Sequence, residues 1–402
     1  MVSVCVVGGG TTGSAAAAEA AARGAEVTVV DRSESPDPPS ASWPDLIRCV
    51  SGRSGERAWS LALPDGMIEA EASSVAGGVV ATSAGVIRAD LVVLATGSSF
   101  EPPTFPGHRK PGVVVLRSFR EYEWLGRESA SMEEVSVTGE GGRGLEVAER
   151  LSGPGRRVNL FVSCWQSDPP SSLVFDVISV AASKMGVSVN LGRVTRAYGA
   201  GRLEAVLANG SVFPCDTLAH VPRKVPRAIR SASRAGPLGG HLVDLNFRTS
   251  IPTILAAGGC AEVAGGRPGR TFEGEPALSG RMAGASCTAL APPAVRARLK
   301  ESFAFGLRWS RFETVPSPWG NARTAKVARR WDESSACEIT FETASKRVVR
   351  IDSVERSPPV GLHPFPVPYD LSLGALAYSL GSSDISLISE TARLALKECR
   401  RS

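Results

Sequence analysis

The 402-residue chain is longer than a single hydrophobic core usually organises, which predicts two or three domains. Of its residues, 43% are hydrophobic and 21% are charged, a composition typical of globular proteins. The net charge of +5 is small for this length and no dense run of Lys and Arg occurs, which argues against a dedicated nucleic-acid-binding protein. The eight cysteines are scattered without a C-x-x-C pair, so neither a metal site nor a disulfide framework is predicted.

The N-terminal residues predict no targeting segment. The chain enters its first apolar run directly, with no basic segment followed by a cleavable apolar one. No uninterrupted apolar stretch approaches the roughly 18 residues that a membrane helix needs. We therefore expect no transmembrane segment and a cytoplasmic protein.

A glycine-rich motif lies near the start of the chain. An apolar run over Val4–Val7 leads into Gly8–Gly13, the first loop, which reads G-x-G-x-x-G. An alanine-rich stretch then runs to Arg23, and a second apolar run ends at Asp31. This order predicts strand, turn, helix and strand, with a pyrophosphate on the helix N-terminus and the acid on a ribose.

The same pattern recurs about 130 residues later. The run Val135–Thr138 leads into Gly139–Gly144, the second loop, and a helical stretch over Leu145–Leu151 precedes the strand-like Val158–Val162. One such motif is a weak signal. Two of them in matching context predict a chain that holds two dinucleotides.

The remaining segments predict further strands, turns and two helices. Short strands over residues 67–90 precede a buried strand, Leu91–Leu94, and the turn Ala95–Gly97. The other predicted elements are a strand over Val187–Leu191, a hairpin with Asn209-Gly210 as its turn, a basic linker over Pro222–Arg234, strands over His241–Asp244 and Thr253–Ala257, a helix over Gly280–Leu290, a hairpin of Glu338–Phe341 with Val348–Ile351, and a terminal helix over Ser386–Arg400.

In this order the motifs resemble one known family. They are the first loop with Asp31, Leu94–Ser98 followed by Glu101-Pro102-Pro103, the second loop with Leu145-Glu146, and the late segment Arg248–Gly258 with its following helix. Up to about residue 290 the chain resembles the FAD-dependent pyridine nucleotide-disulfide oxidoreductases, closest to the branch of NADH oxidases, CoA-disulfide reductases and ferredoxin reductases.

The resemblance implies an α/β fold with two Rossmann-like domains and a C-terminal α+β domain. Residues 1–112 and 236–295 would form an FAD domain, 113–235 an inserted NAD(P)-binding-type domain, and 296–402 an interface domain through which a homodimer could form. The implied cofactor-binding residues in the FAD domain are Gly8, Gly9, Gly10, Thr11, Thr12, Gly13, Asp31, Arg32, Ala95, Thr96, Gly97, Gly258 and Gly259. Those in the inserted domain are Gly139, Gly141, Gly144 and Glu146.

Two departures concern the FAD side. Relatives end the late strand with Gly-Asp, whose carboxylate binds the ribityl chain of FAD, whereas this chain has Gly259. The redox-active cysteine of the branch aligns with Pro44, which can neither attack a disulfide nor form a sulfenic acid. Cys49 is either a displaced nucleophile or a small buried residue, and we favour the second interpretation.

The departures on the NAD(P)H side are more numerous. Val162 stands where an acid would bind the adenosine ribose, and Glu140 brings a negative charge into the phosphate loop. The turn matching Ala95–Gly97 reads Ala219–Pro222, with Pro222 at the glycine position. Glu146 matches a glutamate that relatives place near the nicotinamide, or is a solvated charge in the first turn of a helix.

These features predict an FAD-dependent oxidoreductase, with electron transfer linked to NAD(P)H and no redox-active cysteine. The electron acceptor would be a small molecule or a protein, and no catalytic residue is assigned. The alternative is a non-catalytic nucleotide-binding scaffold that retains the fold. NADH is not distinguished from NADPH, because neither an acid nor an arginine is placed to choose between them.

Overall fold

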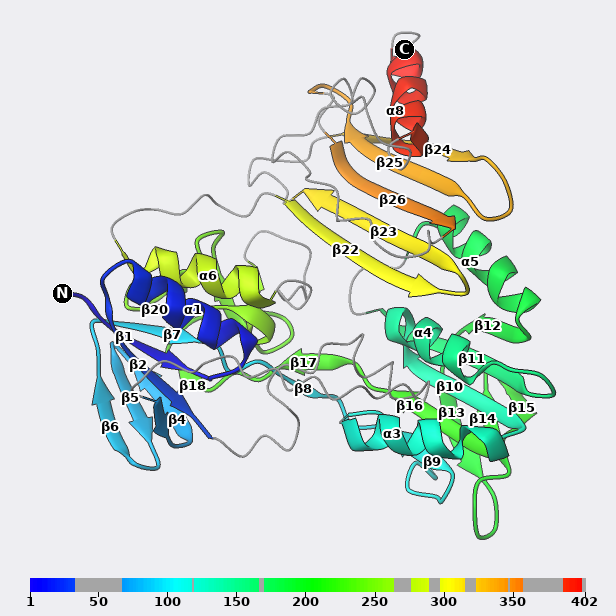
Figure 1. The fold of residues 1–402 in the computed structure, drawn as a ribbon, viewed down its shortest axis with the longest axis horizontal. Coiled ribbons are helices and arrows are strands. Elements are labelled where there is room, and N and C mark those ends of the chain that lie inside the picture. The colour runs from blue at the N-terminus through cyan, green and yellow to red at the C-terminus, as the bar shows by residue number, and fades with distance from the viewer. Residues whose placement is uncertain are drawn as a thin grey trace.

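The computed structural model describes residues 1–32, 67–117, 119–165, 170–263, 276–288, 297–314, 323–345, 348–356 and 386–399. Within these ranges, three five-stranded sheets form the framework. Figure 1 shows the first sheet on the left, the second at the lower right and the C-terminal sheet above the second. None of the described helices combines the length and apolarity needed to cross a membrane.

The first sheet is parallel and carries the first loop. Its order is β20-β7-β1-β2-β3. The strands are β1 (Ser3–Val7), β2 (Glu26–Asp31), β3 (Met67–Glu69), β7 (Leu91–Leu94) and β20 (Ile254–Ala256). Nearly continuous apolar runs bury both faces of β1 and β7, as expected for a parallel sheet covered on two sides. The predicted strand–loop–helix–strand order of this segment is confirmed.

Two helices lie side by side against the first sheet. They are α1 (Thr11–Ala22) and α6 (Pro276–Ser286). Glycines allow the close approach: a β-carbon on Gly280 would lie 2.1 Å from the Thr12 carbonyl oxygen, and one on Gly284 would lie 2.3 Å from that of Ala16. The helix predicted over Gly280–Leu290 therefore exists, but it begins four residues earlier, at Pro276.

A small mixed sheet, in which β18 runs parallel to β4 and the other pairs are antiparallel, packs onto the first sheet. Its order is β18-β4-β5-β6, with bounds β4 (Ala72–Ala76), β5 (Val79–Thr82), β6 (Gly85–Arg88) and β18 (Arg230–Ser231). Val75 and Val80 are buried in the same hydrophobic cluster as Val6 and Val93 of the parallel sheet. The short strands predicted over residues 67–90 are thus confirmed, and β4 is an additional strand among them.

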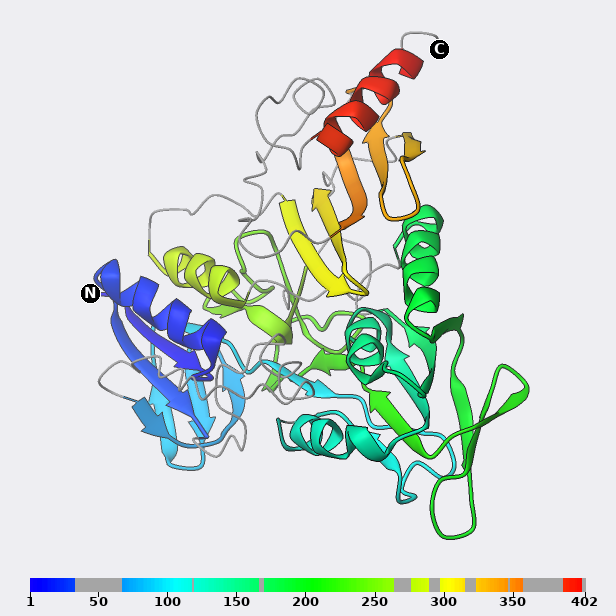
Figure 2. The ribbon, with the colours of Figure 1, turned by 45° about the vertical axis from the view of Figure 1, so that its right-hand side comes forward.

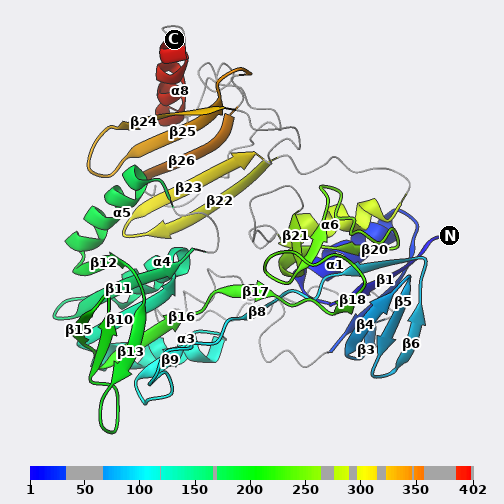
Figure 3. The ribbon, with the colours of Figure 1, turned by 180° about the vertical axis from the view of Figure 1, so that it is seen from behind.

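Two antiparallel strands connect the first sheet to the second. They are β8 (Ser98–Phe100) and β17 (Lys224–Pro226), paired from Phe100 with Lys224 to Ser98 with Pro226. Figure 3 shows them crossing side by side between the two regions. The basic linker predicted after the second sheet therefore contains paired strands.

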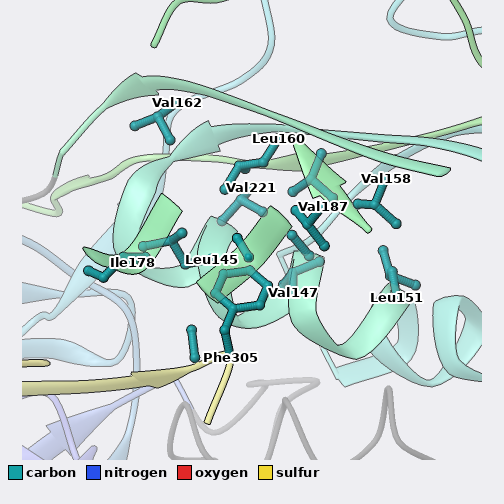
Figure 4. Packing of buried hydrophobic residues seen from close by; sticks show 14 of the residues in the cluster. Leu145, Val147, Leu151, Val158, Leu160, Val162, Ile178, Val187, Val221 and Phe305 are labelled. Atoms are coloured by element: carbon teal, nitrogen blue, oxygen red, sulfur yellow. The ribbon is translucent and has the colours of Figure 1, made fainter. Parts of the chain in front are cut away.

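The second sheet is parallel and carries the second loop. Its order is β12-β11-β10-β16-β9. The elements are β9 (Val113–Val115), α3 (Phe119–Glu128), β10 (Glu134–Glu140), α4 (Gly141–Leu151), β11 (Arg157–Cys164), α5 (Ser172–Lys184), β12 (Val187–Leu191) and β16 (Thr217–Val221). Leu145, Val147 and Leu151 of α4 pack against Leu160 and Val221 of the sheet (Figure 4). The second predicted strand–loop–helix–strand unit is confirmed, whereas α3 and α5 were not predicted.

A three-stranded antiparallel sheet extends from this region. It consists of β13 (Val194–Tyr198), β14 (Ala205–Ala208) and β15 (Ser211–Pro214). Between β14 and β15, Asn209 has φ 51° and Gly210 has φ 80°. Two successive left-handed residues make the type I′ turn that Asn-Gly favours, so the predicted hairpin is confirmed.

The C-terminal sheet is antiparallel and packs on the second sheet. Its order is β22-β23-β26-β25-β24, with bounds β22 (Ala297–Ala304), β23 (Leu307–Thr314), β24 (Thr324–Arg330), β25 (Ala336–Glu342), β26 (Val348–Arg356) and the covering helix α8 (Ser386–Cys399). Phe305 (Figure 4) and Trp309 are buried in the hydrophobic cluster of the second sheet. Helix α5 contacts β25 and β26 (Figure 2). The predicted hairpin and terminal helix are confirmed, and β22–β24 are additional.

Candidate functional site

The first loop makes a turn that only glycine permits. Gly8 follows β1 with φ 109°, and a β-carbon there would lie 2.3 Å from the Ala95 carbonyl oxygen. A β-carbon on Gly13 would lie 1.7 Å from the Gly8 carbonyl oxygen. Both glycines are therefore required by packing, one by the turn and the other by the close approach of α1 to the loop.

The second glycine of the motif faces open space. Gly10 is the N-cap residue of α1 and makes no side-chain cap, and no atom of the described residues lies within 4 Å of the position that its β-carbon would occupy. The N-terminus of α1 carries a partial positive charge and outward backbone N–H groups. Because β1 lies between β2 and β7, this opening is at the switch point of the parallel sheet, where such folds bind nucleotides.

Asp31 lies beside this opening. It ends β2, and its Oδ2 is 2.8 Å from the position of a β-carbon on Gly9. Its Oδ1 accepts a hydrogen bond of 2.8 Å from the backbone N–H of Arg32, whose side chain is exposed. The carboxylate thus lies against the loop, at the end of the second strand, where folds of this type bind an adenosine ribose.

The late glycines and the Ala95–Gly97 turn meet the same edge of the sheet. A β-carbon on Gly258, which has φ 69°, would lie 2.4 Å from Thr12 Oγ1. The Thr96 hydroxyl donates to the Arg227 carbonyl oxygen and so anchors the turn to the segment after β17. Thr11, in the first turn of α1, is half-buried. Three distant segments with predicted FAD-binding residues therefore converge at the first loop.

Gly259 occupies the position of the aspartate found in relatives. Its hypothetical β-carbon would lie 3.1 Å from Ser98 Cβ, so the site of the missing carboxylate borders β8. The adjacent Cys260 is fully buried, donates to the Leu94 and Ala257 carbonyl oxygens at 3.3 Å, and has its thiol pKa raised by burial. A protonated, buried thiol is a poor nucleophile. Pro44 and Cys49 lie outside the described residues.

The second loop repeats the backbone of the first. Gly139 has φ 127°, and its β-carbon would lie 1.9 Å from the Val221 carbonyl oxygen, just as that of Gly8 meets Ala95. Strand register agrees, because Gly139 pairs with Val221 across β10 and β16. Val221 therefore corresponds to Ala95.

This correspondence corrects one prediction. With Val221 matching Ala95, Pro222 corresponds to Thr96, and the glycine position of the turn is taken by Arg223. The prediction that Pro222 replaces Gly97 is therefore wrong by one residue. The shift was hidden in the sequence, because only the pairing of β16 with β10 fixes which residue follows the strand.

Glu140 occupies the phosphate position of the second loop. It is the N-cap residue of α4, and its carboxylate accepts hydrogen bonds from the backbone N–H groups of Gly142 at 3.1 Å and Arg143 at 2.9 Å. The residue is only 5% exposed. A pyrophosphate in a loop of this type uses the same N–H groups and the same positive helix end. Glu140 therefore adds negative charge to the loop and also occupies N–H groups that a pyrophosphate would use.

Arg143 holds this carboxylate in place and was not predicted as a site residue. Its Nε lies 3.3 Å from Glu140 Oε2, and its Nη2 donates to the Pro222 carbonyl oxygen at 2.5 Å. The guanidinium carbon lies 5.9 Å from the centre of the Phe100 ring, within the range of a cation–π contact. Since Phe100 belongs to β8, Arg143 links the loop to the strands that connect the two sheets.

Trp165 covers the second glycine of the loop and was also missed. It follows β11, and its ring atoms lie 2.6–2.7 Å from the position of a β-carbon on Gly141. Two edge-to-face contacts hold the indole. Its ring centre lies 6.3 Å from that of Phe175 and 6.0 Å from that of Trp309 in the C-terminal sheet. At the corresponding Gly10, no atom in the described part of the chain lies within 4 Å of the β-carbon position.

Neither Val162 nor Gly144 offers another contact for a dinucleotide at the second loop. Val162 is 4% exposed and packs in the hydrophobic cluster with Leu160 (Figure 4), so it offers a ribose no acceptor. A β-carbon on Gly144 would lie 3.0 Å from Leu160 Cδ1, a packing contact. As described, this loop does not fit a dinucleotide diphosphate.

Glu146 is half-buried on α4, near the charges of the second loop. Burial raises the pKa of the neighbouring Tyr122, the Arg143 charge lowers it, and the charges of Glu146 and Glu140 raise it further. These side chains therefore form one charged group around the N-terminal part of α4. Among the described residues, no cluster of His, Cys, Asp and Glu could hold a metal ion.

Comparison with known families agrees with this geometry. A family model described as pyridine nucleotide-disulphide oxidoreductase matches residues 64–283, more than half of the chain. The chain belongs to this family. A second model, described as FAD dependent oxidoreductase, matches residues 3–43, which include the first loop and Asp31.

Curated members of the pyridine nucleotide-disulphide oxidoreductase family align with part of the chain. The nitric oxide reductase FlRd-NAD(+) reductase of Aliivibrio fischeri is 29% identical over 43% of this chain and 47% of its own length. The NADH oxidase of Methanocaldococcus jannaschii is 30% identical over 43% of this chain and 40% of its own length. The rubredoxin-NAD(+) reductase of Pseudomonas putida is 30% identical over 42% of this chain and 46% of its own length. The matched part spans less than half the length of each relative.

The fold is shared over the whole chain. The structure of an NAD-dependent persulfide reductase from A. fulgidus superposes with a TM-score of 0.77, covering 100% of this chain and 84% of the other at 19% identity. At that identity the likeness establishes the fold. It confirms the predicted α/β class with two Rossmann-like regions.

Proposed function

We propose that this chain is an FAD-dependent oxidoreductase that passes electrons from NAD(P)H to a small-molecule or protein acceptor without a redox-active cysteine. The first loop carries the proposal: Gly10 provides no side-chain cap at the N-terminus of α1, none of the described residues covers it, and Asp31 lies beside it. These are the features that the diphosphate and the ribose of FAD require.

FAD would supply the hydride-accepting chemistry when bound. The N–H groups at the start of α1 would hold its diphosphate, and Asp31 would accept hydrogen bonds from the adenosine ribose. The Ala95–Gly97 turn and Gly258-Gly259 would line the path of the rest of the cofactor at the same sheet edge. Gly259 contributes no carboxylate, so one charged hydrogen bond of about 1.5–3 kcal/mol is missing.

Family membership and the names of the relatives support the donor and the acceptor classes. Those names specify NADH or NAD(+), and one of them specifies rubredoxin, a protein acceptor. The buried thiol of Cys260, whose pKa burial raises, is consistent with electron transfer that bypasses cysteine.

A cytoplasmic location and a homodimer through the C-terminal region are part of the same proposal. Six cysteines within the described residues are free thiols, the form that the reducing cytosol maintains. The alternative function is a scaffold that keeps the fold without catalysis. The Glu140 and Trp165 contacts at the second loop favour it.

Flavin absorbance of the purified protein tests the proposal. We expect a yellow protein, or a colourless one that takes up added FAD, whose flavin is bleached by NADH or NADPH in the absence of oxygen. The acceptor class then follows from reoxidation by oxygen, quinones or a rubredoxin. A protein that cannot be loaded with FAD would contradict the proposal. A protein that holds FAD which neither nucleotide reduces would support the scaffold.

A further inference from the structure

In the second loop, backbone N–H groups that would bind a phosphate are already hydrogen-bonded to a side chain of the loop itself. The carboxylate of Glu140 receives the backbone N–H groups of Gly142 and Arg143, which start α4. A carboxylate and a phosphate are both anions that the positive end of a helix stabilises. While Glu140 is bound there, the N–H groups of Gly142 and Arg143 are not available to a diphosphate, which meets a like charge instead.

An independent contact closes the same place from the other side. The Trp165 ring lies on Gly141, where the missing side chain would otherwise let a diphosphate approach the backbone. The indole is fixed by edge contacts to Phe175 and to Trp309, which is 9% exposed. Entry of a dinucleotide therefore requires movement of both an anion and an aromatic ring.

Arg143 connects this closure to the strands between the two sheets. Its guanidinium pairs with Glu140, donates to the Pro222 carbonyl oxygen and lies over Phe100. The side chain is only 12% exposed. Release of Glu140 would leave this buried cation facing the loop, where a phosphate could replace the carboxylate as its partner.

We propose that Glu140, Arg143 and Trp165 form a latch, which the diphosphate of NAD(P)H must displace, so that these residues set the affinity for the electron donor. This inference rests on the proposed function, since it takes NAD(P)H to be the donor. The native protein should bind the dinucleotide with a dissociation constant of about 0.1 mM or weaker, with no strong preference between the two forms.

The test is a calorimetric titration of the FAD-saturated protein with ADP-ribose, which carries the diphosphate and adenosine of NAD but no nicotinamide. Glu140→Ala should bind at least tenfold more tightly than the native protein, and Trp165→Ala a few-fold more tightly. Glu140→Gln keeps a cap on α4 without the charge and should gain less than Glu140→Ala. Thermal melting and flavin content show that each variant is folded.

Glu134→Ala is the matched control. Glu134 begins the same strand, β10, and pairs with Arg157 at 2.7 Å, but it lies at the end away from the loop. Its removal should leave ADP-ribose affinity unchanged. A gain equal to that of Glu140→Ala would mean that net charge, and not the latch, sets the affinity, and would overturn the proposal.

Two further results would also overturn the latch. One is micromolar binding of ADP-ribose by the native protein. The other is unchanged affinity in folded Glu140→Ala, Glu140→Gln and Trp165→Ala. Binding of ADP-ribose needs no flavin chemistry, so tight binding by Glu140→Ala in a protein that NADH cannot reduce would uphold the latch and contradict only the proposed function.

Discussion

In both glycine loops the first glycine has a positive φ, and its β-carbon position lies against a backbone carbonyl oxygen at the end of a neighbouring strand. Gly8 meets Ala95 in the first loop, and Gly139 meets Val221 in the second. The surroundings of the two turns nevertheless differ. None of the described residues covers Gly10, whereas the equivalent Gly141 lies under an indole ring.

The same contrast holds for charge. The start of α1 has no side-chain cap, and the next strand ends with the acid Asp31. In contrast, α4 is capped by Glu140, and the strand position that matches Asp31 is the buried Val162. The comparison shows that a glycine motif has two separable roles. Its first and third glycines serve the packing of strand, turn and helix. Ligand binding needs an open second position, an uncapped helix and the acid.

The largest effect should come from the third glycine. A β-carbon in Gly13→Ala would lie 1.7 Å from the Gly8 carbonyl oxygen, so the loop must deform. We expect FAD affinity to fall by more than about a hundredfold, measured by quenching of flavin fluorescence. In Gly144→Ala the new carbon meets only the end of the Leu160 side chain, at 3.0 Å, and FAD affinity should be unchanged. Equal losses of FAD affinity in Gly13→Ala and Gly144→Ala would contradict the assignment of FAD to the first loop.

Each region also contains a histidine that resists protonation: His220 is half-buried and His241 is buried. Burial, with a smaller effect of His108, lowers the pKa of His220 to about 4, and burial lowers that of His241 to about 4. An unfolded histidine has a pKa of about 6.5. Between these values the unfolded chain binds protons that the folded chain does not. Stability should therefore fall as the pH falls from about 6.5 to 4, by up to about 1.4 kcal/mol per pH unit for each histidine.

Urea unfolding at pH 7 and pH 5 checks this dependence region by region. His220→Phe retains an aromatic ring next to Phe105, and His241→Asn retains a hydrogen-bonding partner for Ser233. Each variant should lose part of the acid sensitivity of the native chain. If both variants keep the native difference between the two pH values, neither histidine is its source.

The ribose contact gives the next effect. Asp31→Ala removes the acceptor beside the first loop and should weaken FAD binding about ten- to a hundredfold. Val162→Ala, at the equivalent position of the second sheet, should leave FAD affinity unchanged. Fluorescence titration of both apoproteins is the measurement. Native affinity in Asp31→Ala would show that the ribose of FAD lies elsewhere.

Restoring the aspartate of relatives should have the smallest effect. Gly259→Asp would add a carboxylate for the ribityl chain and tighten FAD binding by about tenfold. The new β-carbon would lie 3.1 Å from Ser98 Cβ, so β8 must shift by a few tenths of an ångström, which limits the gain. The rate of FAD loss on dialysis is the measurement. An unchanged rate would place the ribityl chain away from Gly259.

Much of the fold follows from local sequence patterns. Apolar runs, glycine spacing and the Asn209-Gly210 turn predicted both strand–loop–helix–strand units and the β14–β15 hairpin, because each depends on residues close together in the chain. The helices α3 and α5 were not predicted. The strands β22–β24 were missed because their stability comes from pairing in a sheet, which no single strand specifies.

The sequence by itself determined where the two loops lie, that Gly8 and Gly139 can turn the chain, and that Asp31 has no acidic counterpart at Val162. Only the tertiary structure decided what surrounds each loop. Arg143 contacts Phe100 and the Pro222 carbonyl, and the indole of Trp165 is held between α5 and the C-terminal sheet. These partners are far apart in the chain. Sheet pairing and core packing bring them together, so no local pattern could show that an indole covers the second loop or that Arg143 links it to β8.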